Sequence, residues 1–202
     1  MEFKTTEDKV CYGIGTQVGD QLRHSMFPAF NVDAVIEGIR DSLAGKLQIN
    51  AQEINDAFRV LNEKLAKEQA ALAEVAKKKG AEYLAENAKK ESVVVTPSGL
   101  QYEVLNEGTG ATPNENNVVK VHYHGTLIDG TVFDSSVLRG EPAQFGVNQV
   151  IKGWVEGLQL MKVGSKYRLT IPYELAYGEN GAGSIPPCSV LVFEVELLDI
   201  VK

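Results

Sequence analysis

Cysteine, basic charge and long apolar runs are all scarce in this sequence of 202 residues, and each shortage excludes a class of protein. The two cysteines, Cys11 and Cys188, stand far apart without a metal-binding or redox motif, so we expect buried thiols rather than a disulfide or metal site. The 20 basic residues are outnumbered by 27 acidic ones, and the formal net charge is -7. Because nucleic-acid binding rests on a basic surface patch, we expect protein partners and no nucleic acid.

The sequence also lacks a segment for export or for membrane insertion. Residues 1–10 have neither the apolar core nor the small-residue cleavage site of a secretory signal, and no run of 18 uninterrupted apolar residues occurs. We therefore predict a cytoplasmic protein that does not enter a membrane. The alternative is a mature periplasmic form whose signal was removed, which would show the same pattern.

Motifs for several kinds of chemistry are missing as well. No Gly-x-Ser-x-Gly elbow or Cys/His pair supports acyl transfer. The glycines Gly178, Gly181 and Gly183 match no dinucleotide or phosphate loop and predict a flexible flap instead. His122 and His124 share a face of a predicted strand, but they supply only two of the three or four ligands that zinc requires. We expect no metal and no cofactor.

A change of composition near residue 91 divides the chain. Before it, Pro28 is the only proline and apolar residues recur at helical spacing, whereas from Ser92 onward the apolar pattern shortens toward alternation and glycine and proline become frequent. We expect an all-helical N-terminal domain over residues 1–50, a long helical arm over residues 51–91 and a second domain over residues 92–202.

The N-terminal segment predicts two short amphipathic helices before the arm. Apolar residues recur at helical spacing over residues 12–22, and again over residues 35–43 before Gly45, which suits a helix C-cap. Asn50 and Glu53 have the spacing of a capping box at the start of the arm. Some 40 residues without proline then predict a helix of roughly 60 Å.

The apolar residues of the arm lie mainly in its first half. Ile54, Phe58, Leu61 and Leu65 form a stripe, whereas residues 70–79 mix alanines with lysines, so we expect the first half to be packed and the second half to be mostly exposed. Two short helices and the apolar residues in the first half of the arm provide too small a core for this segment to fold alone. We therefore predict a homodimer through the N-terminal helices, with folding back onto the second domain as the alternative.

The second domain predicts an α+β arrangement. Residues 100–104, 118–123 and 189–200 have the alternating or β-branched pattern of strands, and residues 150–161 contain apolar side chains at helical spacing. A short helix among strands favours one helix packed on an antiparallel sheet.

The order of residues in this domain resembles the FKBP-type peptidyl-prolyl isomerases over residues 94–202. The residues that carry the resemblance are Val121, His122, Tyr123 and Gly125; Phe133, Asp134, Ser135 and Ser136; Arg139 and Gly140; Phe145; Val150, Ile151, Gly153 and Trp154; Ala176, Tyr177 and Gly178; Ile185, Pro186 and Pro187; and Phe193. Residues 12–15 and the long helix are similar to the dimerisation module of the bacterial subgroup that includes the macrophage infectivity potentiator proteins and their cytoplasmic relatives. The resemblance implies an FKBP-like sheet wrapped on a short helix, in a homodimer with long helical arms.

The resemblance also implies an apolar pocket for a prolyl ring. Its implied catalytic residues are Asp134, Tyr177 and Tyr123, and its substrate-binding residues are Phe133, Phe145, Val150, Ile151, Trp154, Ile185 and Phe193. Trp154 would form the floor, the Tyr177 hydroxyl and the Ile151 amide would bind the substrate backbone, and Asp134, hydrogen-bonded to Tyr123, would face the rotating carbonyl. Taken singly, such aromatic residues are ordinary core residues, and only their joint order favours a site.

Two departures from the family pattern are expected at the pocket rim. Ala143 stands where the family usually has an aromatic residue, and the loop over residues 178–185 is shorter than in familiar members. Both bear on substrate preference and on affinity for macrolides such as tacrolimus or rapamycin.

The implied function is the acceleration of rotation about Xaa-Pro bonds in peptides and in unfolded or partly folded proteins. Amide resonance sets a barrier of about 18 to 20 kcal/mol, and a pocket of low polarity favours the twisted bond, in which that resonance is lost, without covalent chemistry. The alternative is a dimeric holdase chaperone or scaffold whose prolyl pocket only binds peptide.

Overall fold

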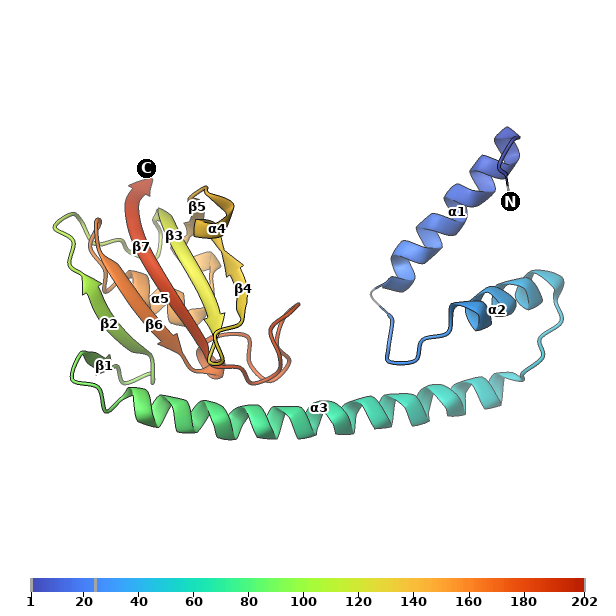
Figure 1. Ribbon diagram of the computed structural model, residues 1–202, viewed down its shortest axis with the longest axis horizontal. Coiled ribbons are helices and arrows are strands. Elements are labelled where there is room, and N and C mark those ends of the chain that lie inside the picture. Colours follow the sequence, from blue (N-terminus) through green and yellow to red (C-terminus); the bar gives the residue numbers. More distant parts are fainter. Residues whose placement is uncertain (1, 24, 202) are drawn as a thin grey trace. The chain divides into compact units, whose positions relative to one another are not determined.

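The computed structural model describes residues 2–23 and 25–201, which divide into two compact units (Figure 1). One unit ends at Val60 and the other begins at Leu61. The predicted domain boundaries at residues 50 and 91 do not coincide with this division and stay predictions. Among the described residues, no helix combines the length and apolar character needed to span a bilayer.

The first unit is helical, as its sequence pattern predicts. It contains α1 (Thr6–Arg23), α2 (Val32–Ala44) and the beginning of α3 (Ala51–Asn87). The Asn31 side chain caps α2 by accepting hydrogen bonds from the amides of Asp33 and Ala34. Gly45 ends α2 in the left-handed region at φ 66°, which confirms the predicted C-cap.

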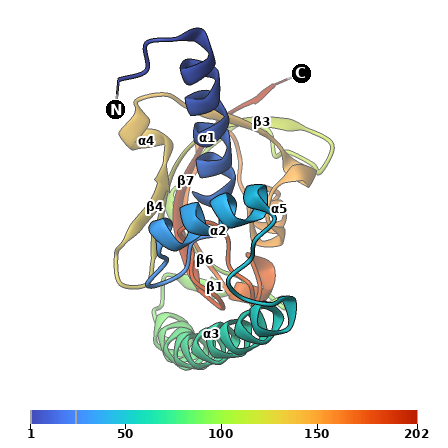
Figure 2. The same cartoon turned by 90° about the vertical axis from the view of Figure 1, so that its right-hand side faces the viewer.

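Helix α3 is one continuous helix of 37 residues, seen along its length in Figure 1 and from one end in Figure 2. Its start confirms the predicted capping box. The Glu53 amide donates to Asn50 Oδ1 at 2.9 Å, and the Asn50 amide donates to Glu53 Oε2 at 3.4 Å. These two bonds satisfy amides that the first turn of a helix leaves without partners.

Two burial predictions for the helical segment need correction. The second half of α3 is mostly exposed, as predicted, although the two buried residues of this helix, Gly80 and Asn87, lie there, whereas the first half, which was predicted to be packed, is exposed in the single chain. The expected buried thiol is observed for Cys188 but is wrong for Cys11, which is exposed in the single chain because α1 has no buried residue.

The second unit contains an antiparallel sheet and a short helix, which confirms the predicted α+β, FKBP-like class. Its strands are β1 (Val93–Val95), β2 (Gln101–Asn106), β3 (Val118–Leu127), β4 (Val132–Ser135), β5 (Ala143–Gly146), β6 (Lys166–Ile171) and β7 (Leu191–Val201). Their order is β1-β2-β6-β7-β3-β4, and β5 pairs with β3. The helices are α4 (Ser136–Arg139) and α5 (Lys152–Leu158), with short 3-10 turns η1 (Val147–Gln149) and η2 (Tyr173–Leu175).

Alternation along the central strands directs one face of the sheet toward α5 (Figure 1). On β3 the side chains of Val119, Val121 and Tyr123 are buried, while the residues between them are partly exposed. The long strand β7 pairs with β3 over its length and repeats the alternation from Leu191 to Leu197. The buried face of both strands therefore joins α5 in a single core.

Two glycines let α5 approach the sheet closely. A Cβ atom on Gly153 would lie 2.4 Å from Ile171 Cγ2, and one on Gly157 would lie 2.7 Å from Leu169 Cδ1. Larger residues at these positions would push α5 away from β6. The close approach presses Trp154 of α5 onto the sheet, where it is only 4% exposed.

Candidate active site

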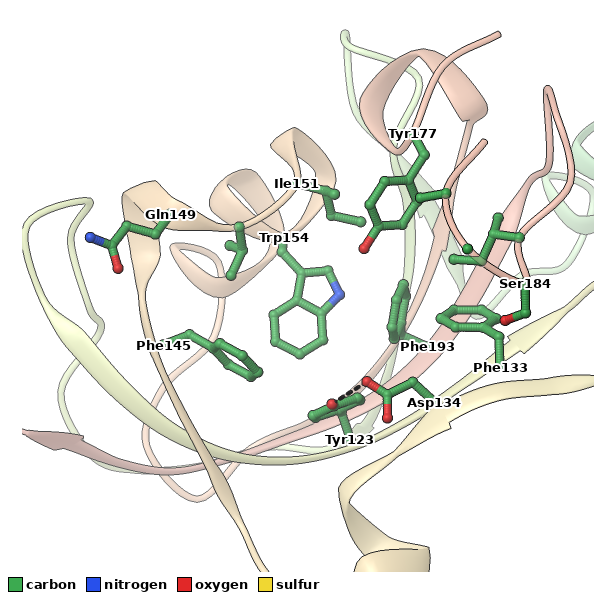
Figure 3. A pocket seen from close by; sticks show the side chains of 14 residues that line it. Tyr123, Phe133, Asp134, Phe145, Gln149, Ile151, Trp154, Tyr177, Ser184 and Phe193 are labelled. Atoms are coloured by element: carbon green, nitrogen blue, oxygen red, sulfur yellow. Dashed lines mark hydrogen bonds between the residues drawn. The ribbon is translucent and has the colours of Figure 1, made fainter. Parts of the chain in front are cut away.

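A hollow of about 710 Å³ lies over the indole of Trp154 (Figure 3). Its lining residues are Tyr123, Phe133, Asp134, Phe145, Gln149, Val150, Ile151, Trp154, Tyr177, Ala182, Gly183, Ser184, Ile185 and Phe193. All ten residues that the sequence analysis assigned to a pocket are therefore together in one place, although they come from four strands, one helix and two loops.

The floor of the hollow is an aromatic cluster centred on Trp154. The centroid of its ring system lies 5.4 Å from that of Tyr123, 5.7 Å from that of Phe145 and 5.2 Å from that of Phe193. All three contacts are edge-to-face, with interplanar angles of 84°, 87° and 80°. Edge-to-face packing adds stability beyond area burial and holds each ring in one orientation, so the floor is rigid and apolar.

Asp134 is the carboxylate of the hollow, and it belongs to a hydrogen-bonded group of three. The Tyr123 hydroxyl donates to Asp134 Oδ2 at 2.5 Å. Arg139 donates to the other carboxylate oxygen of Asp134, and its second nitrogen donates to the Tyr123 hydroxyl at 2.8 Å. The guanidinium carbon also lies 5.6 Å from the centroid of the Tyr123 ring. Asp134 is thus oriented from both sides.

These contacts decide the charge state of the group. Desolvation alone would raise the pKa of Asp134, but the hydrogen bonds from Tyr123 and Arg139 and the positive charge of Arg139 outweigh it, so the pKa lies below its ordinary value. Desolvation and the hydrogen bond to Asp134 raise the pKa of Tyr123. At neutral pH the site therefore holds a carboxylate beside a neutral phenol, a pair that orients rather than transfers protons.

Two serines behind Asp134 hold this part of the site in place. The Tyr123 amide donates to Ser136 Oγ at 2.8 Å, and Ser135 Oγ caps α4 by accepting from the Leu138 amide. His122 Nδ1 lies 3.1 Å from Ser136 Oγ, and His124 Nδ1 lies 2.9 Å from Ser135 Oγ. Within the described residues, no group of three or more His, Cys, Asp or Glu side chains is arranged to hold a metal.

The rim of the hollow supplies polar groups near its mouth. Tyr177 is 42% exposed, and its hydroxyl points into the hollow (Figure 3). Ile151 is the N-cap of α5; its carbonyl accepts from Trp154 and Val155, while its amide donates no backbone hydrogen bond among the described residues. A phenol and a free amide are groups that can bind a peptide backbone.

Some residues of the site were not found from the sequence. Gln149 lines the hollow and Arg139 holds Asp134, yet neither had an assigned role, whereas Ala182 to Ser184 line the hollow as part of the loop that was expected at its rim. Arg139 was visible only as one residue of the family resemblance, since its contact with Tyr123 spans 16 positions. Ala143, which was expected at the rim, does not line the hollow; it packs against the core from β5.

Comparison with known proteins gives similarity along the whole chain. Residues 110–198 match the family described as FKBP-type peptidyl-prolyl cis-trans isomerase, and residues 7–104 match the domain amino terminal to FKBP-type peptidyl-prolyl isomerase. The FKBP-type 22 kDa peptidyl-prolyl cis-trans isomerase of Escherichia coli K12 is 54% identical over 98% of this chain and 97% of its own length. The isomerase FkpA of Aeromonas hydrophila is 48% identical over 100% of this chain and 79% of its own.

A solved structure agrees with these sequence matches. The crystal structure of FkpA from Escherichia coli superposes with a TM-score of 0.69 at 38% identity, covering 98% of each chain. The similarity therefore includes the helical N-terminal region as well as the domain that holds the hollow.

Proposed function

Because this chain belongs to the family of FKBP-type peptidyl-prolyl cis-trans isomerases, we propose that the hollow over Trp154 is where it accelerates rotation about Xaa-Pro bonds. The observation that carries the proposal is the convergence of ten pocket residues on one apolar floor. The prolyl ring would lie on the indole of Trp154, between Phe145, Ile151 and Phe193.

The mechanism follows from the chemistry of the imide bond. Rotation breaks no covalent bond but must overcome the resonance of the planar form, a barrier of about 18 to 20 kcal/mol. The twisted form has less charge separation than the planar form, so an apolar wall favours it relative to water. Because the aromatic floor is rigid, it does not have to rearrange while the bond rotates. It therefore stabilises the twisted transition state without a cost of reorganisation.

We assign orienting roles to the polar groups at the mouth. The Tyr177 hydroxyl and the Ile151 amide would bind the substrate backbone on either side of the rotating bond. Asp134 would face the rotating carbonyl carbon as an anion, held by Tyr123 and Arg139. Its lowered pKa supports an electrostatic role and argues against a role as a proton donor.

Refolding of a proline-limited protein tests the assignment. Catalytic amounts of the full chain should accelerate the slow phase, which otherwise takes tens to hundreds of seconds, and Asp134→Ala with Tyr177→Ala should abolish most of the acceleration. Lys78→Ala, an exposed change on α3, is the control. A double variant that refolds the substrate as fast as wild type would contradict the assignment. A wild type that only prevents aggregation would favour the holdase alternative.

We further propose a homodimer through the N-terminal helices. Neither α1 nor α2 has a buried residue, and large apolar side chains are exposed on both helices and on the start of α3, among them Tyr12, Ile36, Leu43 and Phe58. So many exposed apolar side chains in one small unit indicate a missing partner surface, and a second copy is the simplest source.

Macrolides such as tacrolimus and rapamycin are proposed ligands of the same hollow. A volume of about 710 Å³ with an aromatic floor suits a large apolar ring system. Competition with a proline peptide in the isomerase assay would test this.

For the compartment, the cytoplasmic prediction and its periplasmic alternative both stay predictions, and cell fractionation would separate them. One relative, from Legionella longbeachae, is named outer membrane protein MIP.

A further inference from the structure

One wall of the hollow is a loop that we call the flap, residues 178–188. Ala182, Gly183, Ser184 and Ile185 of the flap line the hollow. The flap is closed internally, because the Ala182 amide donates to the Ile185 carbonyl at 3.0 Å and the Ile185 amide donates back at 2.8 Å. Its two ends are joined by the Cys188 amide, which donates to the Gly178 carbonyl at 3.1 Å. These hydrogen bonds link the tip of the flap within itself and its two ends to each other.

Helix α3 contacts the flap at Glu179 and contacts Val190, just beyond the end of the flap. Lys77 Nζ lies 2.9 Å from Glu179 Oε1, and the two residues are 102 positions apart in the sequence. Of the three consecutive lysines, Lys77 alone is partly buried, while Lys78 and Lys79 are exposed. One turn further on, Gly80 lies so close to Val190 that an added Cβ would be 2.8 Å from Val190 Cγ2.

A buried pair of amides fixes the far end of the same half of α3. The Asn87 side chain donates to Gln101 Oε1 at 2.9 Å, and the Gln101 side chain donates to the Leu84 carbonyl at 2.9 Å. Gln101 begins β2, so these bonds join the last turns of α3 to the sheet. A helix is stiff over the ten residues from Asn87 to Lys77, a length of about 15 Å. The position of the Lys77 ammonium group is therefore fixed relative to the sheet.

From these contacts we propose that Lys77 is a positioning residue for the isomerase reaction: through Glu179 it holds the flap, and with it Ile185, at the wall of the prolyl hollow. This inference rests on the proposed function of the hollow. It gives the second half of α3 a role in catalysis that does not depend on dimer formation.

The expected effect lies in substrate binding rather than in rotation. The flap forms a wall, whereas the floor belongs to α5 and the sheet, so a displaced flap weakens the contact with substrate and leaves the floor unchanged. An exposed ion pair has a modest effect, so we expect a rise in KM of about threefold for Lys77→Met with kcat unchanged. Methionine keeps the apolar stem of the side chain and removes only the charge.

The experiment uses the full chain and exchange NMR on a short Xaa-Pro peptide at low salt. Lys77→Met should raise KM, while Lys77→Arg, which keeps the positive charge, should stay near the wild-type KM. Lys78→Met is the matched control and should change nothing. Amide hydrogen exchange at Ala182 and Ile185 should accelerate in Lys77→Met alone, which reports on the flap independently of activity.

The outcomes separate the inference from the function on which it rests. A wild type without any acceleration would overturn the proposed function. An active wild type whose KM and flap exchange are unaltered by Lys77→Met would overturn the inference and leave the function intact. Equal changes for Lys77→Met and Lys78→Met would also overturn it, because the effect would then follow the net charge of the helix instead of the contact with Glu179.

Discussion

Tyr123 contacts both the apolar floor of the hollow and its carboxylate, Asp134. Its ring contacts the indole of Trp154 edge-to-face, and its hydroxyl donates to Asp134 and accepts from Arg139. One side chain thereby orients both the apolar floor and the carboxylate. Because burial and the hydrogen bond to Asp134 raise the pKa of Tyr123, its hydroxyl stays protonated as a donor at neutral pH.

Replacing Trp154 by leucine tests the floor. Leucine keeps an apolar side chain but removes the flat surface under the prolyl ring, so we expect kcat/KM for a short peptide to fall about tenfold, equivalent to ~1.4 kcal/mol of transition-state stabilisation. Peptide isomerisation kinetics measure the change. Tyr102→Leu is the control, because Tyr102 stacks on Tyr167 outside the hollow at 5.7 Å; it should lower the thermal unfolding temperature without lowering kcat/KM. Equal losses of kcat/KM for both variants would count against the floor.

The charge state of Asp134 predicts a flat pH profile. Its pKa is lowered below 3.8, so the carboxylate stays ionised from about pH 8 down to pH 5 and catalysis should not change in that range. The stabilising effect of the ionised group is present above pH 3.8 and is lost as the pH falls through the lowered pKa. Arg139→Met removes one of the groups that lower this pKa, so its activity should begin to fall at a higher pH than in wild type. A wild-type rate that declines between pH 8 and pH 5 would contradict the prediction.

At the scale of elements, α3 has different surroundings along its length. Its first turn depends on local capping by Asn50 and Glu53, whereas its last turns depend on the buried amides of Asn87 and Gln101. Helix α5 depends instead on the absence of side chains at Gly153 and Gly157, which brings it against β6. Local sequence therefore determines where α3 starts, and packing determines where it is held.

The cap of α3 predicts a loss of stability for Asn50→Ala. Alanine cannot accept the hydrogen bond from the Glu53 amide, and a lost N-cap costs about 1 kcal/mol. Urea unfolding of the full chain, followed by far-UV circular dichroism, would measure the loss. Gln52→Ala is the control, since Gln52 lies in the same turn and its side-chain hydrogen bond to Asp56 is exposed. An unchanged unfolding midpoint for Asn50→Ala would show that the cap does not stabilise α3.

At the scale of the whole molecule, the two compact units differ in how much apolar surface they bury. The second unit has a continuous core from Leu100 to Leu197, whereas the helices of the first unit leave their apolar faces exposed in the single chain. Covering these apolar faces would remove apolar surface from water and so stabilise the first unit.

Association in solution tests whether a second copy covers the first unit. Leu43 is 86% exposed in the single chain, so Leu43→Glu should have little cost in a monomer but should dissociate a dimer that buries it. Analytical ultracentrifugation at micromolar concentration would measure the mass. Leu72→Glu is the control, because Leu72 is exposed on α3 beyond the first unit. A wild-type chain that sediments as a monomer would refute the dimer.

Tethering two sites predicts a difference between substrates. A fragment of residues 61–202, which keeps the second half of α3 on the sheet, should match the full chain on short peptides but be less efficient on a refolding protein, since two linked sites raise the effective concentration. Residues 92–202 alone, the second domain that the composition predicts, lack Lys77 and should have a higher KM than the full chain on both kinds of substrate. Equal efficiency of the full chain and residues 61–202 on a refolding protein would refute the role of the arms.

Some helices and strands are predictable from the sequence, and others are not. The three N-terminal helices and strands β2, β3 and β7 were predicted because their apolar periodicity or caps are local. Strands β1, β4 and β5 are three or four residues long, too short for a periodic pattern. Strand β6 was not predicted, although its buried residues Tyr167, Leu169 and Ile171 alternate. The pocket residues were found only through the family resemblance, since no local pattern relates Tyr123 to Phe193.

The sequence by itself determined the helix caps, the α+β class and, through the order of its aromatic residues, the membership of the family. Only the tertiary structure decided that Arg139 holds Asp134, that Ala143 lies outside the hollow and that the second half of α3 reaches the flap. The physical reason is the separation in the sequence between the residues that interact. Caps and periodicity arise between residues a few positions apart, whereas the contact between Lys77 and Glu179 exists only after the sheet has brought together segments 102 residues apart.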